Sequence, residues 1–430
     1  MQRKAVETGF YKRSSKLLPS KFFDILLHVA SINGIFSLGQ ACCEIAESSC
    51  ISISKQGLDD RFNDSSVTFI QSIFEEQLAR QIDGTIHPDF LKKFSRVRIK
   101  DSTRFDLSEK LKEHFHGFGG KVTSDAAVCV QYEFDIKDGK LLDVDFTHAI
   151  SSDKTDAKNK ANDIQKGDLI IRDLGYYSTD VIKKIINKEA FFISRLNLKL
   201  LIFEDEKEIS FSSLHRKMIK DQQSHLEKQV LIGKEDKVPV RMIIDIIPEE
   251  VYQKRITKAA KECKKKGFQL SDEYKARARF NLFITNVPQA EIPSTQVYQL
   301  YKIRWQIELM FKIWKSTCGI DKIQPMKYQR WMCLFYAKFI IILINNQLIN
   351  LLQKACYEKY GKLLSKQKCF KTLTNYFYKT REALFRSNQN LSIFIKSISN
   401  LLSKNHWLEK RKERTNYVDI FTLFICNTNI

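Results

Sequence analysis

The stretch that most constrains the fold runs from Tyr301 to Lys315 and reads YKIRWQIELMFKIWK. It contains no glycine or proline, and its apolar residues recur at helical spacing, which predicts a single helix. At about 100° per residue, four polar side chains lie within about 60° of one another: Tyr301, Arg304, Glu308 and Lys315. The opposite face is apolar and suits a buried core. The simplest interpretation of the polar face is a solvated surface with ion pairs between neighbouring turns.

Two aspartates follow stretches that have strand patterns. Asp101 follows residues 97–100, where apolar residues alternate with cations and predict a half-buried strand. Asp173 closely follows the continuous apolar run 169–171, which suits a central strand. Side chains at strand ends are fixed by the core and still reach solvent, so the two aspartates form a candidate acidic site. Each aspartate taken alone is more often a turn or capping residue.

These motifs together resemble a known family. The spacing Tyr-x2-Arg-x3-Glu-x6-Lys is similar to the signature of the DDE transposases of bacterial insertion sequences, in the superfamily named for insertion sequence four. The contexts strand-Asp-Ser-Thr at Asp101 and strand-Asp-x-Gly-Tyr at Asp173 resemble the first and second carboxylate motifs of that family. The resemblance covers roughly residues 95–345 and is most specific in residues 301–315.

The resemblance implies a role for each of six side chains. The catalytic and metal-binding set is Asp101, Asp173 and Glu308. The DNA-binding set is Tyr301, Arg304 and Lys315. Two Mg²⁺ ions, for which Mn²⁺ can substitute, suit hard carboxylate ligands and support phosphodiester cleavage. Four other aspartates are weaker candidates for metal ligands because they lack the family context: Asp143, Asp145, Asp153 and Asp156.

The predicted fold class is α/β. The strand order and the resemblance imply a ribonuclease-H-like catalytic core, interrupted by a β-rich insertion and flanked by helical regions. The expected ranges are 1–90 for a helical N-terminal region that binds DNA ends, 91–195 for the first part of the core, 196–279 for the insertion with a basic helix, 280–350 for the second part of the core with the Glu308 helix, and 351–430 for a helical C-terminal region that could support dimerisation. From the residues alone, the N-terminal helices are equally compatible with a helix-turn-helix and with a plain bundle.

Short local signals make further predictions. The Asp-Gly pair at 138–139 predicts a hairpin between strands 127–134 and 141–146. Ser178 is expected to cap the helix that follows Asp173. Ser294 is expected to cap the helix that carries the polar face described above.

The composition favours a polyanion as partner. The chain has 71 Lys and Arg against 50 Asp and Glu, which gives a formal net charge of +21. Such a surplus suits nucleic acid or an acidic membrane surface, and interleaved aromatic residues favour nucleic acid. The basic helix expected over 249–266 is either a phosphate contact or a solvated face, and the basic block 410–414 is expected to be exposed. A lysine-rich composition also arises from a biased genome.

Three observations favour an intracellular protein that does not enter a membrane. The most apolar run, residues 331–352, is long enough to cross a bilayer, but Lys338 and the polar residues 345–347 interrupt it and predict a buried helix. The ten cysteines include no CxxC pair and no zinc-finger spacing. With no apolar signal segment after the basic start, this predicts reduced thiols and a cytoplasmic protein.

The resemblance implies a transposase that binds the terminal inverted repeats of an insertion sequence and carries out cut-and-paste transposition. Its partners would be the double-stranded DNA of the transposon ends and of the target, and a second copy of the chain in the synaptic complex, at the bacterial nucleoid. Two other interpretations remain open: a metal-dependent nuclease on the same core, and a catalytically silent DNA-binding regulator derived from a transposase. Three intact carboxylates argue against the silent regulator, because a binding module does not need them.

Overall fold

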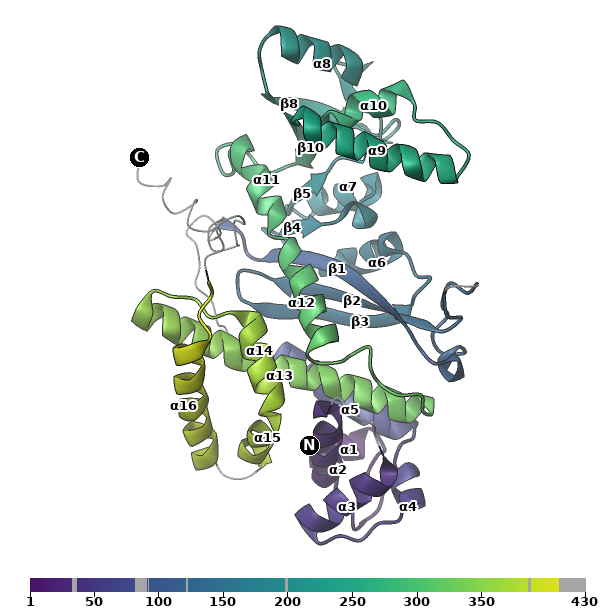
Figure 1. Ribbon diagram of the computed structural model, residues 1–430, viewed down its shortest axis with the longest axis vertical. Coiled ribbons are helices and arrows are strands. Elements are labelled where there is room, and N and C mark those ends of the chain that lie inside the picture. Colours follow the sequence, from purple (N-terminus) through teal and green to yellow (C-terminus); the bar gives the residue numbers. More distant parts are fainter. Residues whose placement is uncertain are drawn as a thin grey trace. The chain divides into compact units, whose positions relative to one another are not determined.

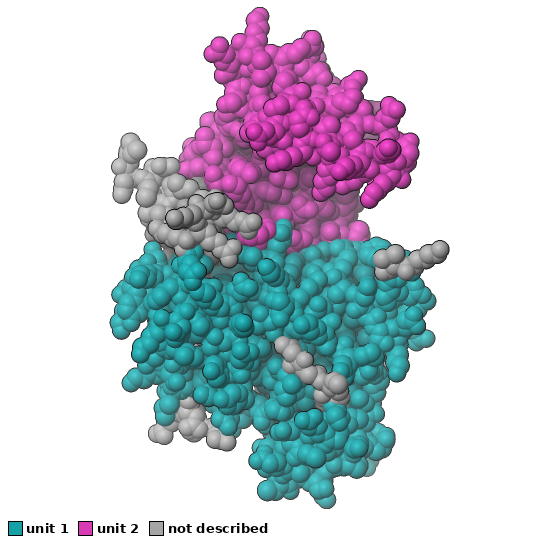
Figure 2. All heavy atoms as spheres, viewed as in Figure 1, with its two compact units in different colours: residues 1–87, 102–151, 306–414 teal, residues 88–101, 152–305, 415–430 magenta. Residues whose placement is uncertain are grey.

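The computed structural model describes residues 1–32, 37–81, 91, 93–120, 123–197, 200–385 and 388–409. The basic block 410–414 lies outside these residues. The chain forms two compact units, coloured separately in Figure 2. Unit 1 comprises Met1–His87, Ser102–Ser151 and Gln306–Arg414, and unit 2 comprises Pro88–Asp101, Ser152–Trp305 and Thr415–Ile430. Neither unit is a continuous segment of the chain.

Unit 1 is mainly helical. Its N-terminal helices are α1 (Gln2–Glu7), α2 (Pro19–Ser31), α3 (Leu38–Ser49), α4 (Lys55–Asp59) and α5 (Asp64–Ala79). Its later helices are α12 (Trp305–Ser316, whose first residue belongs to unit 2), α13 (Tyr328–Tyr360), α14 (Lys366–Asn375), α15 (Phe377–Phe385) and α16 (Asn388–Asn405). Helices α2 and α5 pack on the long helix α13 (Figure 1). Segments that are far apart in the sequence therefore share one core.

Helix α13 contains the apolar run that the sequence singled out. By length and composition it is the one helix of the described residues that could cross a membrane, and 83% of its most apolar window is buried inside the structure. Two of its buried amides bind the hairpin turn: Asn346 and Asn350 donate from Nδ2 to the carbonyl oxygen of Gly139, at 3.1 and 2.8 Å. The buried amide of Asn345 has no hydrogen-bond partner among the described residues. Burial in a protein core, as predicted, accounts for this helix without a membrane.

A buried lysine lies in the same helix. Lys338 is 6% exposed, and its Nζ donates to the carbonyl oxygens of Ala30 and Cys318, each at 3.0 Å. Ala30 is in the last turn of α2, where a cation is favoured by the helix dipole. Burial lowers the pKa of Lys338 to about 8, because a charged ammonium loses its hydration there.

The strands of unit 1 begin with a hairpin. β2 (Ala127–Asp135) and β3 (Lys140–His148) pair antiparallel, which confirms the hairpin predicted at residues 138–139. Gly139 has a φ of 68°, a conformation that glycine adopts at no steric cost. A Cβ there would also lie 3.0 Å from Nδ2 of Asn350. The positive φ therefore favours glycine at this turn, and a side chain there would also crowd the amide of Asn350.

Strand β1 (Val97–Asp106) belongs to both units, since the boundary falls between Asp101 and Ser102. It is longer than predicted, so Asp101 lies within the strand and not at its end. In unit 1 the strand order is β3-β2-β1, and in unit 2 it is β1-β4-β5-β10-β9-β8-β6-β7. The further strands are β4 (Leu169–Arg172), β5 (Phe191–Arg195), β6 (Ile202–Glu204), β7 (Lys207–Glu208), β8 (His225–Ile232), β9 (Val238–Ile246) and β10 (Phe280–Thr285).

Unit 2 is a mixed α/β structure. β1, β4 and β5 pair in parallel, whereas the pairs from β5–β10 outward are antiparallel. Its helices are α6 (Asp153–Asn159), α7 (Thr179–Asn187), α8 (Phe211–Lys220), α9 (Glu249–Lys265), α10 (Asp272–Ala278) and α11 (Ser294–Lys302). Ser178 caps α7 as predicted, accepting a hydrogen bond from the N–H of Val181.

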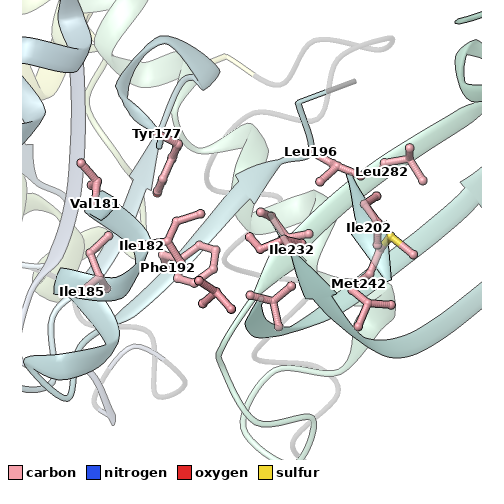
Figure 3. Close-up of a cluster of buried hydrophobic side chains, with 14 of the residues drawn as sticks. Tyr177, Val181, Ile182, Ile185, Phe192, Leu196, Ile202, Ile232, Met242 and Leu282 are labelled. Carbon is pink, nitrogen blue, oxygen red and sulfur yellow. The ribbon is translucent and has the colours of Figure 1, made fainter. Parts of the chain in front are cut away.

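An apolar cluster holds unit 2 together (Figure 3). Val181, Ile182 and Ile185 of α7 pack with Phe192 of β5 and with Met242 of β9. The cluster therefore joins the parallel strands to the antiparallel ones, and burying each such side chain stabilises the fold by about 1.5–3 kcal/mol.

The predicted solvated face of residues 97–100 is wrong. Both faces are buried, with Arg98 and Lys100 exposed by 2% and 0%. Arg98 donates to Asp168 and Lys100 pairs with Asp156 of α6, at 3.1 and 2.8 Å. Alternation of apolar and charged residues indicates a half-buried strand only when the charged residues lack buried counter-charges, and here α6 and the loop before β4 supply them.

Candidate active site

The two predicted aspartates lie side by side on neighbouring strands. The last residue pair of the parallel β1–β4 register is Lys100 with Arg172, and Asp101 and Asp173 each follow by one residue. Asp173 keeps an extended backbone, with φ −73° and ψ 161°. Paired residues of parallel strands lie about 4.8 Å apart and point to the same face of the sheet. The structure therefore brings these two carboxylates together, as the strand positions predicted.

Two signature residues contact these aspartates. The Arg304 guanidinium donates from Nη1 to Oδ2 of Asp101 at 2.8 Å, with side chains only 17% and 21% exposed. The Tyr301 hydroxyl donates to Oδ1 of Asp173 at 3.4 Å. All four residues belong to unit 2. The arginine and the tyrosine are thus not part of a merely solvated helix face, because each meets one of the strand carboxylates.

The ring of Tyr301 is tightly surrounded. It meets Phe283 edge to face at 5.2 Å, and the guanidinium carbons of Arg195 and Arg304 lie 5.7 and 5.9 Å from its centroid. Burial, and to a lesser degree the carboxylate of Asp173, raises the pKa of Tyr301 to about 12. At neutral pH this phenol is therefore protonated and acts as a hydrogen-bond donor.

The prediction of one continuous helix over residues 301–315 is wrong. α11 ends at Lys302 and α12 begins at Trp305, with a two-residue turn between them. The N–H groups of Ile303 and Arg304 bond to carbonyl oxygens three residues back, of Leu300 and Tyr301, which is the tighter pattern of a helix end. No glycine or proline marks the break. It falls where Arg304 binds Asp101, a contact that helical periodicity cannot reveal.

Glu308 and Lys315 lie on α12, within unit 1. Glu308 is an exposed residue of the first turn, and Lys315 lies in the last turn. Lys315 donates from Nζ to the carbonyl oxygen of Arg104 on β1 at 3.0 Å, and burial lowers its pKa. Seven residues, about two turns, separate them, so they share one face of the helix. Glu308 and Lys315 thus belong to unit 1, whereas the other four predicted site residues belong to unit 2: Asp101, Asp173, Tyr301 and Arg304.

The donor set fits a divalent metal. Asp101 and Asp173 offer neighbouring carboxylates, the hard oxygen ligands that Mg²⁺ and Mn²⁺ prefer. Within the described residues, no group of three His, Cys, Asp or Glu side chains gathers at one point. Asp156, one of the weaker candidates, instead forms the ion pair with Lys100. The strand carboxylates are therefore the better candidate ligands.

One hydrogen-bonded chain escaped prediction. Nδ1 of His225 lies 2.6 Å from Oδ1 of Asp245, and its Nε2 lies 2.8 Å from Oγ of Ser294. The predicted capping role of Ser294 is wrong, because Pro293 is the cap residue and Ser294 is the first residue of α11. These two hydrogen bonds of His225 attach the first turn of α11, the helix that contains Tyr301, to β8 and β9. These residues are widely separated in the sequence, so no local pattern indicates the contact.

A mixed α/β sheet that presents neighbouring carboxylates to an arginine and a tyrosine is compatible with the class of enzymes that cleave phosphodiesters with divalent metal. Residues 92–344 match the family model described as "Transposase DDE domain". Because the match spans more than half of the sequence, the chain belongs to the DDE transposase family, as its motifs predicted.

Individual relatives agree with the family. The transposase for insertion sequence element IS231B of Bacillus thuringiensis subsp. berliner is 28% identical over 438 residues, spanning 98% of this chain and 91% of the relative. The transposase for insertion sequence element IS1151 of Clostridium perfringens is 30% identical, spanning 80% and 77%. Among solved structures, the cryo-EM structure of a piggyBac transposase synaptic complex with hairpin DNA aligns with a TM-score of 0.43 at 11% identity, covering 97% of this chain and 83% of that chain.

Proposed function

We propose that this chain binds the terminal inverted repeats of an insertion sequence, cleaves DNA strands there with divalent metal, and joins the freed 3′ ends to a target. The observation that carries the proposal is the contact of Arg304 with Asp101 and of Tyr301 with Asp173. A signature of phosphate-binding side chains thereby meets the carboxylates that would bind metal. Family membership supplies the reaction class.

Asp101, Asp173 and Glu308 would hold the metal. Two Mg²⁺ ions, or Mn²⁺ in their place, supply an activated attacking oxygen and a stabilised leaving oxygen when bound. Arg304 and Lys315 hold the phosphates that flank the scissile bond, Arg304 through a planar fork that matches phosphate geometry. Tyr301 donates a hydrogen bond to a phosphate oxygen, since burial raises the pKa of its phenol and favours the protonated form.

The finer architecture is part of the proposal. The strand order β3-β2-β1-β4-β5 supports a ribonuclease-H-like core over residues 91–195 and 280–350, with a β-rich insertion at 196–279. Residues 1–90 would bind the DNA ends, and residues 351–430 would support a homodimer that holds two ends together. The surplus of positive charge supports action on double-stranded DNA at the nucleoid, in the cytoplasm.

The test is cleavage of DNA that carries the element ends with their flanking sequence. Wild-type protein with Mg²⁺ or Mn²⁺ should cut only at the ends, and removal of metal by EDTA should stop cleavage but not DNA binding. Asp173→Asn and Glu308→Gln should lower the rate by about 100- to 1,000-fold, because each replaces a charged carboxylate ligand by a neutral amide. Asp143→Asn is the matched control and should cut normally. Tight binding without cleavage, or normal cleavage by the first two variants, would overturn the proposal.

A further inference from the structure

Helix α9 carries a row of lysines on one face. They are spaced by four, three and four residues, so at about 100° per residue they lie within about 60° of one another. These four side chains, the α9 stripe, are Lys254, Lys258, Lys261 and Lys265. All four are exposed, and among the residues that the structure describes none pairs with a carboxylate. The nearby acid Glu262 lies about 80° from Lys254, outside the row, whereas Glu250 in the first turn of the helix lies about 40° from Lys254.

The opposite face of α9 attaches the helix to unit 2. Tyr252 and Ile256 pack against Ala278, and the guanidinium of Arg279 lies 4.0 Å from the centroid of the Tyr252 ring. Arg255 donates from Nη1 to the carbonyl oxygens of Ala278 and Phe280, at 2.9 and 2.8 Å. Tyr252 and Ile256 lie about 160° from Lys254 around the helix. The docked side thus orients the α9 stripe toward solvent.

An exposed aromatic ring stands at the end of this helix. Gly267 has a φ of 74°, and the N–H groups of Gly267 and Phe268 bond to the carbonyl oxygens of Lys264 and Cys263. This is the Schellman arrangement, in which the residue at the Phe268 position usually packs back on the helix. Here the ring is 70% exposed. Its backbone is therefore fixed by hydrogen bonds while its aromatic face is available to a partner.

Spacing and chemistry indicate the partner. The α9 stripe is about 16 Å long, a length over which one strand of B-DNA presents about five phosphates. Lysines beside an exposed aromatic ring suit nucleic acid, because the ring can stack on an unpaired base. A helix that binds membranes would carry several large apolar residues beside its lysines. The other exposed positions between Lys254 and Lys265 hold Thr257, Ala260, Glu262 and Lys264, none of which is a large apolar residue.

We propose that the α9 stripe binds the phosphodiester backbone of DNA and that Phe268 stacks on an unpaired base of the bound strand. This surface shares no residue with the carboxylate site. The inference rests on the proposed function only for the choice of DNA among polyanions. It makes α9 a second DNA contact, which adds affinity that does not depend on the sequence of the element ends.

The test measures how affinity depends on salt. A 30-bp duplex without element ends is titrated between 50 and 200 mM salt in EDTA, so that no cleavage occurs. The first variant changes the α9 stripe from lysine to glutamine, which keeps helix propensity. The control changes four exposed lysines of unit 1 to glutamine: Lys354, Lys371, Lys396 and Lys404. Removing one lysine that neutralises a phosphate should lower the slope of log K against log salt by about 0.9.

We expect the stripe variant to lower the slope by about 3 to 4 and the control to lower it by less than about 1. Equal reductions in the two variants, or no reduction in the stripe variant, would overturn the proposal. The proposal would also be overturned if the stripe variant lost the binding to phosphatidylserine vesicles that wild type shows while its salt slope on DNA stayed unchanged. That result would assign the surface to a membrane. Failure of end cleavage with the expected slopes would refute the proposed function and leave this inference standing.

Phe268→Ala tests the ring separately. It should weaken binding of a duplex with a single-stranded overhang roughly tenfold, the effect of removing one base–aromatic stack. It should leave the affinity for the fully paired duplex, and the salt slope on both DNAs, unchanged. Unchanged affinity for the overhang DNA would overturn the stacking part of the proposal.

Discussion

Arg304 is the residue whose chemistry is most specific in this structure. Its guanidinium binds Asp101 at 2.8 Å, while the family signature assigns it to phosphate. A guanidinium presents five donors in a rigid fork, so it can serve a carboxylate and a phosphate in one geometry. A lysine ammonium keeps the charge and loses the fork.

Arg304→Lys should therefore lower the single-turnover cleavage rate by about 10- to 100-fold, the value of a charge-assisted hydrogen bond. Affinity for end DNA should change much less, because the positive charge is kept. Lys312→Gln, at an exposed position of α12, is the control and should cut normally. A wild-type rate in Arg304→Lys would show that the fork is not used.

Lys338 predicts a pH dependence of stability. Its pKa is about 8 in the folded protein and close to 10.5 when unfolded. Between these values the unfolded chain binds more protons, so stability rises with pH across this window. Relative to Lys338→Met, the free energy of unfolding of wild type should gain up to about 3 kcal/mol between pH 8 and 10.5. Denaturant unfolding at several pH values measures this, with exposed Lys354→Met as control, and a constant difference would refute it.

At the scale of elements, the position of α11 depends on a contact between three chain segments. His225 of β8, Asp245 of β9 and Ser294 of α11 form one hydrogen-bonded chain. Since α11 also carries Tyr301, loosening its first turn should disturb the contact of that phenol with Asp173.

Ser294→Ala should lower the free energy of unfolding by about 1 kcal/mol, the typical value of one hydrogen bond. The double variant Ser294→Ala/Asp245→Asn should lose less unfolding free energy than the sum of the two single losses, because both substitutions disturb the same hydrogen-bonded group. Ser212→Ala, an exposed serine of α8, should have no effect. Additive losses in a double-mutant cycle would show that His225, Asp245 and Ser294 do not act together.

The elements also show what a sequence can predict. Positions governed by local chemistry were predicted correctly: the hairpin at 138–139, the cap at Ser178 and the strand that ends just before Asp173. The errors arose where a distant group decided the outcome. β1 buries cations because Asp156 and Asp168 neutralise them, and the helix over 301–315 breaks where Arg304 meets Asp101.

At the scale of the whole molecule, the family and the reaction class were predictable because the signature combines fixed spacing with three motifs in order. The division of the chain into two units was not predictable from the sequence. β1 and α12 each continue across the boundary between units, at Asp101 and Trp305, where the local pattern shows no interruption. Periodicity describes one element at a time and carries no information on how distant segments are grouped.

The packing of α2 and α5 on α13 has a consequence for biosynthesis. The ribosome makes α2 and α5 early, yet their partner α13 begins about 250 residues after the end of α5. At about 5–20 residues per second, the nascent chain waits roughly 12–50 s with these apolar faces uncovered. A chain that ends before α13 therefore leaves the apolar faces of α2 and α5 without this partner, and exposed apolar surface of that kind is prone to aggregation.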